Sequence, residues 1–205
     1  MYKRFCLLLF AFIMILSAMI ALPASSYAQS FSDTLTAFNS DRISLNQKGM
    51  SVLTGWALTN IAIGSVGYFN SNGTTKYLHQ MNVGWNLVNL AIAGGALYQY
   101  AHTDPASFTL AKSMSEAQSI ENILMLNIGL NVSYMAAGGY LWERGIRKSS
   151  NRLQGYGQSL LIQGGFLLLF DSALYWLNRS HNSQLDSILE HINITGTQLS
   201  VSIPL

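Results

Sequence analysis

Four apolar runs of about twenty residues each dominate the middle of the sequence. They cover residues 50–69, 77–100, 119–142 and 156–177, with short polar segments between them. An α-helix rises 1.5 Å per residue, so about 20 apolar residues cross the ~30 Å hydrocarbon core of a bilayer. The runs do not alternate polar and apolar positions with a period of two, which argues against a transmembrane β-barrel. The pattern predicts an all-α fold, a four-transmembrane-helix bundle.

The N-terminal segment has the layout of a secretory signal peptide. Lys3 and Arg4 precede an apolar stretch at 5–22, and a small-x-small triplet ends at Ala28. We therefore expect cleavage after Ala28. A retained membrane anchor is the alternative, because the stretch is longer than the usual ~7–15 residues. Cys6, the one cysteine, lies in this segment, so the mature chain would have neither a disulfide nor a thiolate metal site.

The segments that flank the four runs have different patterns. Phe31, Leu35 and Phe38 recur at helical spacing and predict a short interfacial helix in the N-terminal flank. At the C-terminus, apolar and polar residues alternate on both sides of 195–197, which predicts an extended tail or β-hairpin. The expected organisation is a signal peptide at 1–28, an interfacial segment at 29–49, a four-helix membrane domain at 50–177 and an extramembrane tail at 178–205.

Composition and charge agree with a membrane protein. Only 10% of the residues are charged, against about 25% in a soluble domain. The net charge is +2 and no basic stripe carries interleaved aromatics, so nucleic acid is not an expected partner. The densest group of Lys and Arg lies at 144–152, between the third and fourth runs. The positive-inside rule places this loop in the cytoplasm and both mature termini outside, in the periplasm.

Two of the runs contain similar ten-residue segments, GWALTNIAIG at 55–64 and GWNLVNLAIA at 84–93, which we call the two copies of the GW repeat. An Asn amide inside a bilayer has no water to pair with, so it must face a neighbouring helix. Asn60 and Asn89 are therefore expected either to join helices as structural glue or to line a polar cavity. Small residues are expected to let the backbones approach at this contact. These are Gly55, Gly64, Gly84, Gly94 and Gly95.

Steps of three or four residues place the other polar side chains of the runs on common helix faces. The candidate ligand-binding residues are Asn60, His79, Asn86, Asn89, Asn127, Asn131, Gln163 and Asp171. Asp171 is the strongest candidate, because a carboxyl at the bilayer centre costs ~2.5–3.5 kcal/mol on insertion scales. Counting turns places Asn127 at the depth of Asp171 and makes it the expected hydrogen-bond donor. The alternative is an Asp171 side chain that reaches the outer surface.

No motif in the sequence specifies a reaction. His79 has no second intramembrane histidine for haem ligation, and no two-His-plus-carboxylate spacing is present. Phosphate-binding glycine loops and hydrolase signatures are also missing. We expect no metal and no cofactor. An intramembrane enzyme would have to use Asp171 and His79, which the turn count places near opposite faces of the bilayer.

Two blocks carry a family resemblance. They are YLHQMNVGWNLVNLAIAGG at 77–95, with its HQMN–WN–VN pattern, and QGGFLLLFD at 163–171. From Gly49 to Trp176 the chain resembles a family of small bacterial multi-pass membrane proteins classed as a domain of unknown function. The resemblance implies a location in the bacterial inner membrane and adds no catalytic residue.

The expected function is therefore that of an integral membrane protein whose polar interior binds or scaffolds something small. A small-solute or proton-coupled transporter or channel is the alternative, and an intramembrane enzyme comes third. The expected partners are the lipid bilayer and a small ligand, and the chain could also contact a second copy of itself or another membrane protein.

Overall fold

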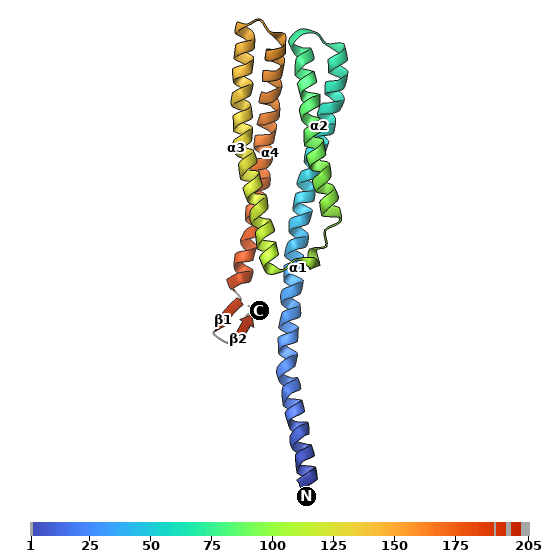
Figure 1. Cartoon of the computed structure of the whole chain (residues 1–205), viewed down its shortest axis with the longest axis vertical. Helices are drawn as coiled ribbons and strands as arrows, with labels where there is room; N and C mark the ends of the chain where they lie inside the picture. The colour runs from blue at the N-terminus through green and yellow to red at the C-terminus, as the bar shows by residue number, and fades with distance from the viewer. Residues whose placement is uncertain (1, 191, 196–197, 202–205) are drawn as a thin grey trace.

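The predicted all-α fold with four long helices is confirmed in the computed structural model of the chain (Figure 1). The structure describes the backbone of residues 2–190, 192–195 and 198–201, and the side chains of 29–185 and 189. The helices are α1 (Tyr2–Asn70), α2 (Gly73–Ala101), the short 3-10 helix η1 (Pro105–Ser107), α3 (Leu110–Arg147) and α4 (Asn151–Glu190). Two strands, β1 (Ile192–Thr195) and β2 (Gln198–Val201), pair antiparallel with Ile192 opposite Val201.

Local signals in the sequence explain where the helices start. Gly73 has a φ of 57° and begins α2, a conformation that glycine adopts without steric cost. Asp104 caps η1, because its Oδ1 accepts a hydrogen bond from the Ala106 amide at 2.9 Å. Thr109 caps α3 in the same way through the Lys112 amide at 3.3 Å. The segment between the second and third apolar runs, 101–118, is therefore a loop only in its first part, since α3 begins at Leu110.

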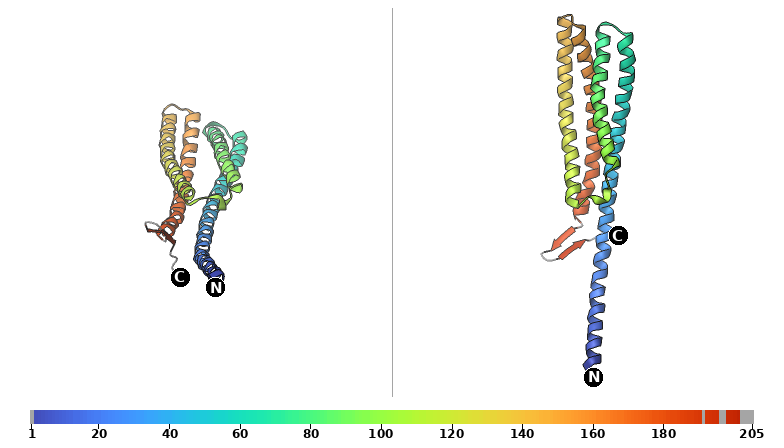
Figure 2. Two further views of the ribbon diagram at one scale, coloured as in Figure 1. Left: turned by 60° about the horizontal axis from the view of Figure 1, so that its bottom comes forward. Right: turned by 45° about the vertical axis from the view of Figure 1, so that its right-hand side comes forward.

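Helices α1 and α2 form one antiparallel hairpin and α3 and α4 form another, and the two hairpins meet mainly through α2 and α4 (Figures 1 and 2). The two tight turns lie at the same end, where Thr74 Oγ1 donates a hydrogen bond to Asn151 Oδ1 at 3.0 Å. This end carries most of the basic residues of the loops. They are Lys76, Arg144, Arg147, Lys148 and Arg152.

Beyond the end of α2, the bundle continues as three helices, α1, α3 and α4 (Figure 2). Phe38 on α1, Ala117 on α3 and Leu185 on α4 form the hydrophobic core of this part. The expected boundaries at 49/50 and 177/178 therefore fall inside continuous helices. Residues 178–190, expected in an extramembrane tail, continue α4, and Asn178 and Leu185 are buried.

The distribution of polar and apolar side chains is the reverse of that in a soluble protein. The largest fully buried side chains are all polar: Gln163, Asn39, Asn86, Asn178, Ser113 and Ser159. Large apolar side chains cover the outside, with Phe69 83% exposed, Leu169 74% and Trp176 69%. Among the described residues, the exposed large hydrophobics lie in the four predicted runs, except Met114 and Ile146. Water-soluble monomers rarely expose apolar surface on this scale.

Two helical segments are long and apolar enough to cross a membrane, Gln29–Asn70 of α1 and Asn151–Leu185 of α4. Within the described part of the chain, α2 and α3 do not reach the same hydropathy. Their buried residues include Asn82, Asn86 and Asn89 on α2 and Ser113 and Asn131 on α3, which lower the average of each helix.

The expectation that glycines of the GW repeat bring helices together is wrong for four of the five residues. A Cβ added at Gly55, Gly84, Gly94 or Gly95 would meet nothing within 4 Å, because these glycines face outward. Gly64 alone packs closely, against Val83 on α2. Close backbone approaches occur at other glycines. A Cβ on Gly138 of α3 would lie 2.9 Å from the carbonyl oxygen of Gly157 on α4, and a Cβ on Gly155 of α4 would collide with the carbonyl oxygen of Thr74 on α2.

Candidate functional site

Gln163 is the centre of a hydrogen-bonded network that joins three helices. Its side chain is fully buried on α4, and its Oε1 accepts a hydrogen bond from Trp56 Nε1 on α1 at 2.9 Å. Its amide nitrogen donates to Asn60 Oδ1 on α1 at 3.3 Å and to Asn82 Oδ1 on α2 at 3.2 Å. Trp56 also stacks on Phe166, with ring centroids 3.7 Å apart. Two residues of the first GW copy, Trp56 and Asn60, thus form hydrogen bonds between α1 and α4.

The amides along α2 extend this network toward the other end of the helix. Ser159 of α4 also donates to Asn82 Oδ1, and Asn86 donates to the backbone oxygen of Asn82 at 2.8 Å. Asn89 in turn donates to Asn86 Oδ1 at 3.4 Å. Asn60 and Asn89 therefore bond to different partners, and the expectation that they form one shared contact is wrong.

His79 occupies a separate position at the start of α2. Its ring fills the space above Gly67 of α1, where an added Cβ would collide with the imidazole. Neither His79 nor Gly67 lines the cavity that contains Asp171. The structure therefore does not bring His79 and Asp171 together in this cavity.

Asp171 is buried on α4 with 5% of its surface exposed, and it faces α3. Asn131 Nδ2 donates a hydrogen bond to Asp171 Oδ2 at 2.6 Å. Asn127, the expected donor, lies one helical turn away on α3 and is also a side-chain hydrogen-bond partner of this carboxyl. The close approach of Gly138 and Gly157 packs α3 against α4 and brings both amides to Asp171.

A cavity of about 350 Å³ lies between α2 and α3, with α4 and Leu53 of α1 as its floor. Its polar lining is formed by Asn89, Asn127, Asn131 and Asp171, together with the aromatic residues Trp85 and Tyr134. Its apolar lining is formed by Leu53, Val88, Ile92, Leu130 and Leu167. The cavity thus collects four of the eight candidate residues. Asn60, Asn86, Gln163 and His79 lie outside it.

The second copy of the GW repeat belongs to this cavity. Trp85 packs edge-on against Tyr134, with ring centroids 4.8 Å apart and an interplanar angle of 81°. Its indole nitrogen is buried and has no hydrogen-bond partner among the described residues. An unpaired buried donor costs free energy, so a partner for this N–H would be stabilising. The helical spacing that connects Trp85 to Asn89, and Tyr134 to Asn131, could have pointed to both aromatic residues.

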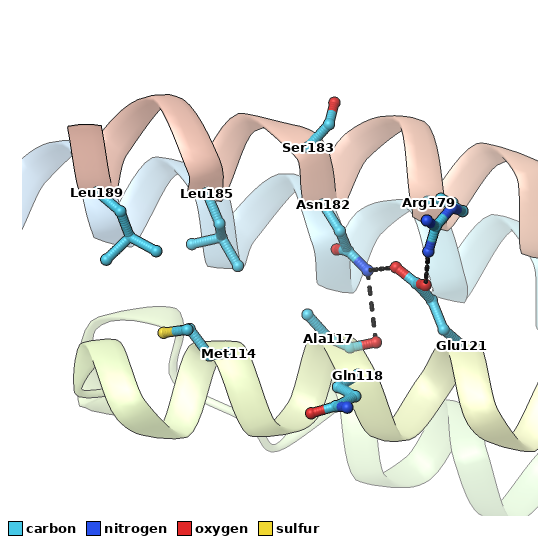
Figure 3. A pocket seen from close by; sticks show the side chains of 9 residues that line it. All are labelled: Met114, Ala117, Gln118, Glu121, Arg179, Asn182, Ser183, Leu185 and Leu189. Carbon is cyan, nitrogen blue, oxygen red and sulfur yellow. Dashed lines mark hydrogen bonds and ion pairs between the residues drawn. The ribbon is translucent and has the colours of Figure 1, made fainter.

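A second cavity, of about 360 Å³, lies between the N-terminal part of α3 and the C-terminal part of α4 (Figure 3). Glu121 accepts hydrogen bonds from Arg179 at 3.0 Å and from Asn182 at 2.8 Å, so both of its oxygens are occupied. Met114, Leu185 and Leu189 form its apolar end. Because the two charges neutralise each other, this cavity is the weaker candidate for a ligand site.

A buried arginine that sequence analysis missed ties the α2–α3 connection to α1. Arg42 is 2% exposed, donates to Asn39 Oδ1 at 3.1 Å and lies 5.1 Å from the ring centre of Phe108. Its burial lowers the pKa of the guanidinium, and the attraction of Glu116 opposes this. Arg42 lies outside the four predicted spans, and its contact with Phe108 holds the α2–α3 connection against α1. Among the described side chains, no group of three His, Cys, Asp or Glu could hold a metal ion.

Comparisons with known proteins identify a family and no individual relative. No curated protein and no solved structure matches the chain. A family model described as a family of unknown function, DUF6992, matches residues 52–172. This region is more than half of the chain and contains all of α2 and α3 and every residue that lines the cavity between them. The chain belongs to the DUF6992 family.

Proposed function

We propose that this protein is a four-span inner-membrane protein that binds a small, lipid-soluble molecule in the cavity between α2 and α3. The observation that carries the proposal is that Trp85, whose buried N–H is unpaired, lines the same cavity as Asp171. The matching family is one of unknown function, so the proposal is argued from the cavity alone.

The apolar exterior supports insertion of all four helices in the membrane. Helices α1 and α4 are candidate spans by length and composition. Helices α2 and α3 also expose large apolar side chains, such as Ile92 at 59% exposure and Leu126 at 64%. In water this surface would promote aggregation, whereas hydrocarbon solvates it. The buried amides then form hydrogen bonds with one another inside the bundle, because the hydrocarbon core offers polar groups no water.

The charges support an orientation with both tight turns in the cytoplasm. The basic residues at that end satisfy the positive-inside rule, so both mature termini lie in the periplasm. Helix α1 is continuous, and the 27 residues between its two apolar stretches, 5–22 and 50–69, would span about 40 Å of helix. Both stretches could not lie in one bilayer along a single straight helix, which favours removal of the first one as a signal peptide.

The rim of the cavity favours a ligand that enters from the lipid. Val88 and Ile92 on α2 are each 59% exposed and Leu130 on α3 is 39% exposed, so apolar side chains surround the opening. Three polar residues of the lining, Asn89, Asn131 and Asp171, are buried. A molecule with an apolar body and a small polar group fits both parts, as in most small-molecule sites.

Blocking the opening tests this proposal. The detergent-purified protein would be incubated with 4-phenoxybutanol, a small neutral probe with two oxygen acceptors, and examined by native mass spectrometry. The wild type should form a one-to-one adduct. Leu130→Trp should fill the cavity mouth and weaken binding by about tenfold or more, since a tenfold loss requires only 1.4 kcal/mol of lost contact.

Val132→Trp is the matched control, because Val132 lies on the same helix, is 53% exposed and does not line the cavity. This variant should bind the probe like the wild type. Absence of an adduct on the wild type, or equal binding by Leu130→Trp, would show that the cavity is not a ligand site.

A further inference from the structure

We infer that the ligand of the α2–α3 cavity is a lipid-soluble organic ammonium compound that also carries an acceptor oxygen. The inference rests on the proposed function, because it names the chemistry of the molecule that this cavity would take. Three observations carry it: the missing countercharge of Asp171, the aromatic corner beside it, and the unpaired indole N–H.

The first observation concerns charge. The four apolar runs contain no Lys or Arg, and their two acidic residues are Glu121 and Asp171. Glu121 has a cationic partner in Arg179. Within the described residues, no ion pair includes Asp171, whose hydrogen-bond partners are the neutral amides of Asn131 and Asn127. A buried carboxylate without a cation is costly, so a cationic ligand would be stabilised there.

The second observation concerns the aromatic rings. Trp85 and Tyr134 meet at 81° and form a corner in the lining that also contains Asp171. Ring faces attract organic cations through the negative potential of their π-electrons, and aromatic cages that bind ammonium groups use rings set at an angle. A carboxylate beside such a corner selects a positive charge over a neutral group of the same size.

The third observation adds an oxygen to the ligand. An ammonium group has N–H donors and cannot accept the hydrogen bond that Trp85 Nε1 has available. An ether or hydroxyl oxygen on the same molecule would accept it. The apolar rim at Val88, Ile92 and Leu130 then requires a hydrocarbon body. Amino ethers and amino alcohols with an apolar tail meet all three requirements.

Three probes of nearly equal size, each with the same ether oxygen, isolate the contribution of the ligand's charge. They are 4-phenoxybutylamine, which is cationic at pH 7, 4-phenoxybutanol, which is neutral, and 4-phenoxybutanoate, which is anionic. Their affinities would be measured by isothermal titration calorimetry on the detergent-purified full chain, with Leu130→Trp as the correction for partition into detergent. We expect the amine to bind about thirtyfold or more tightly than the alcohol, from a charge pair of ~2 kcal/mol, and the carboxylate to bind weakest.

Asp171→Asn keeps the shape and removes the charge. It should abolish the preference for the amine over the alcohol, and its midpoint of thermal unfolding in detergent checks that the variant is folded. Equal binding of amine and alcohol by the wild type would overturn the ammonium inference while the proposed function stood. An amine preference that persisted in Asp171→Asn would also overturn it. Failure of every probe to bind would overturn both proposals.

Discussion

Gln163 and Asp171 lie two turns apart on one helix, both are buried, and their surroundings give them different roles. Gln163 has partners on α1 and α2 for both of its polar atoms. Asp171 has only neutral amides as partners and lines a cavity, which Gln163 does not. At the scale of single residues, contact with a cavity therefore separates a candidate binding group from a structural polar group.

Replacing Gln163 should destabilise the bundle. Gln163→Leu would remove the partner of Trp56 Nε1 and leave that donor unpaired, at a cost of about 1–3 kcal/mol. The measurement is the midpoint of thermal unfolding in detergent, followed by circular dichroism. Gln99→Leu is the matched control, because Gln99 is exposed on α2. Equal stability of Gln163→Leu and wild type would mean that the network does not hold the helices together.

Two substitutions at Asp171 should have different effects on stability. Asp171→Asn retains an oxygen that accepts the hydrogen bond from Asn131, so the unfolding midpoint should change little. Asp171→Leu removes that oxygen and leaves the Asn131 amide unpaired, which should destabilise the fold by about 1–3 kcal/mol. Thermal unfolding in detergent distinguishes them. If the Leu variant were as stable as the Asn variant, the contact with Asn131 would have no structural role.

At the scale of helices, close packing of α3 on α4 sets the register that pairs Asn131 with Asp171. Gly138 and Gly157 allow this approach, because each backbone lies where a side chain of the other would be. The exposed glycines of the GW repeat have no such neighbour. The same residue type thus has a packing role on one helix pair and none on the surface of another.

Gly157→Ala should therefore weaken the fold, whereas Gly165→Ala on the same helix should not. A methyl group on Gly157 would collide with backbone atoms of Gly138 and Trp142, and overpacking typically costs about 1–3 kcal/mol. Gly165 has nothing within 4 Å, and Ala is favoured over Gly in a helix by about 1 kcal/mol. Unfolding midpoints of the two variants should move in opposite directions. A shift of the same sign and size in both would contradict this packing.

At the scale of the whole molecule, both tight turns lie at one end and the η1 loop lies toward the other (Figure 1). Reporter fusions in bacterial cells should therefore place Lys148 in the cytoplasm and Asp104 and Leu205 in the periplasm. A fusion at Asn72 is the internal control, since its turn adjoins the turn that contains Lys148 and must give the same result. A periplasmic reporter at Lys148 would reverse the proposed orientation.

The sequence alone determined the helical class and located one apolar run in each of the four long helices, although three of these helices extend well beyond their runs. Apolar runs of membrane-spanning length and polar residues at helical spacing are local patterns, so they can be read without knowing which helices touch. The same spacing identified Asp171, Asn127, Asn131 and Asn89, which the structure brings to one cavity. Burial of Asp171 followed from its cost at a lipid-facing position.

Only the tertiary structure decided which polar residues bond and which remain available. The two GW copies look alike in sequence, yet Trp56 meets Gln163 while Trp85 meets Tyr134 and keeps an unpaired N–H. These outcomes depend on the rotation and axial offset of neighbouring helices, and a shift of one turn changes every partner. Sequence periodicity predicts which residues share one face of a helix, but it does not predict which helix that face contacts. The cavity could therefore be identified only from the tertiary structure, in which the close packing of α3 on α4 sets their register.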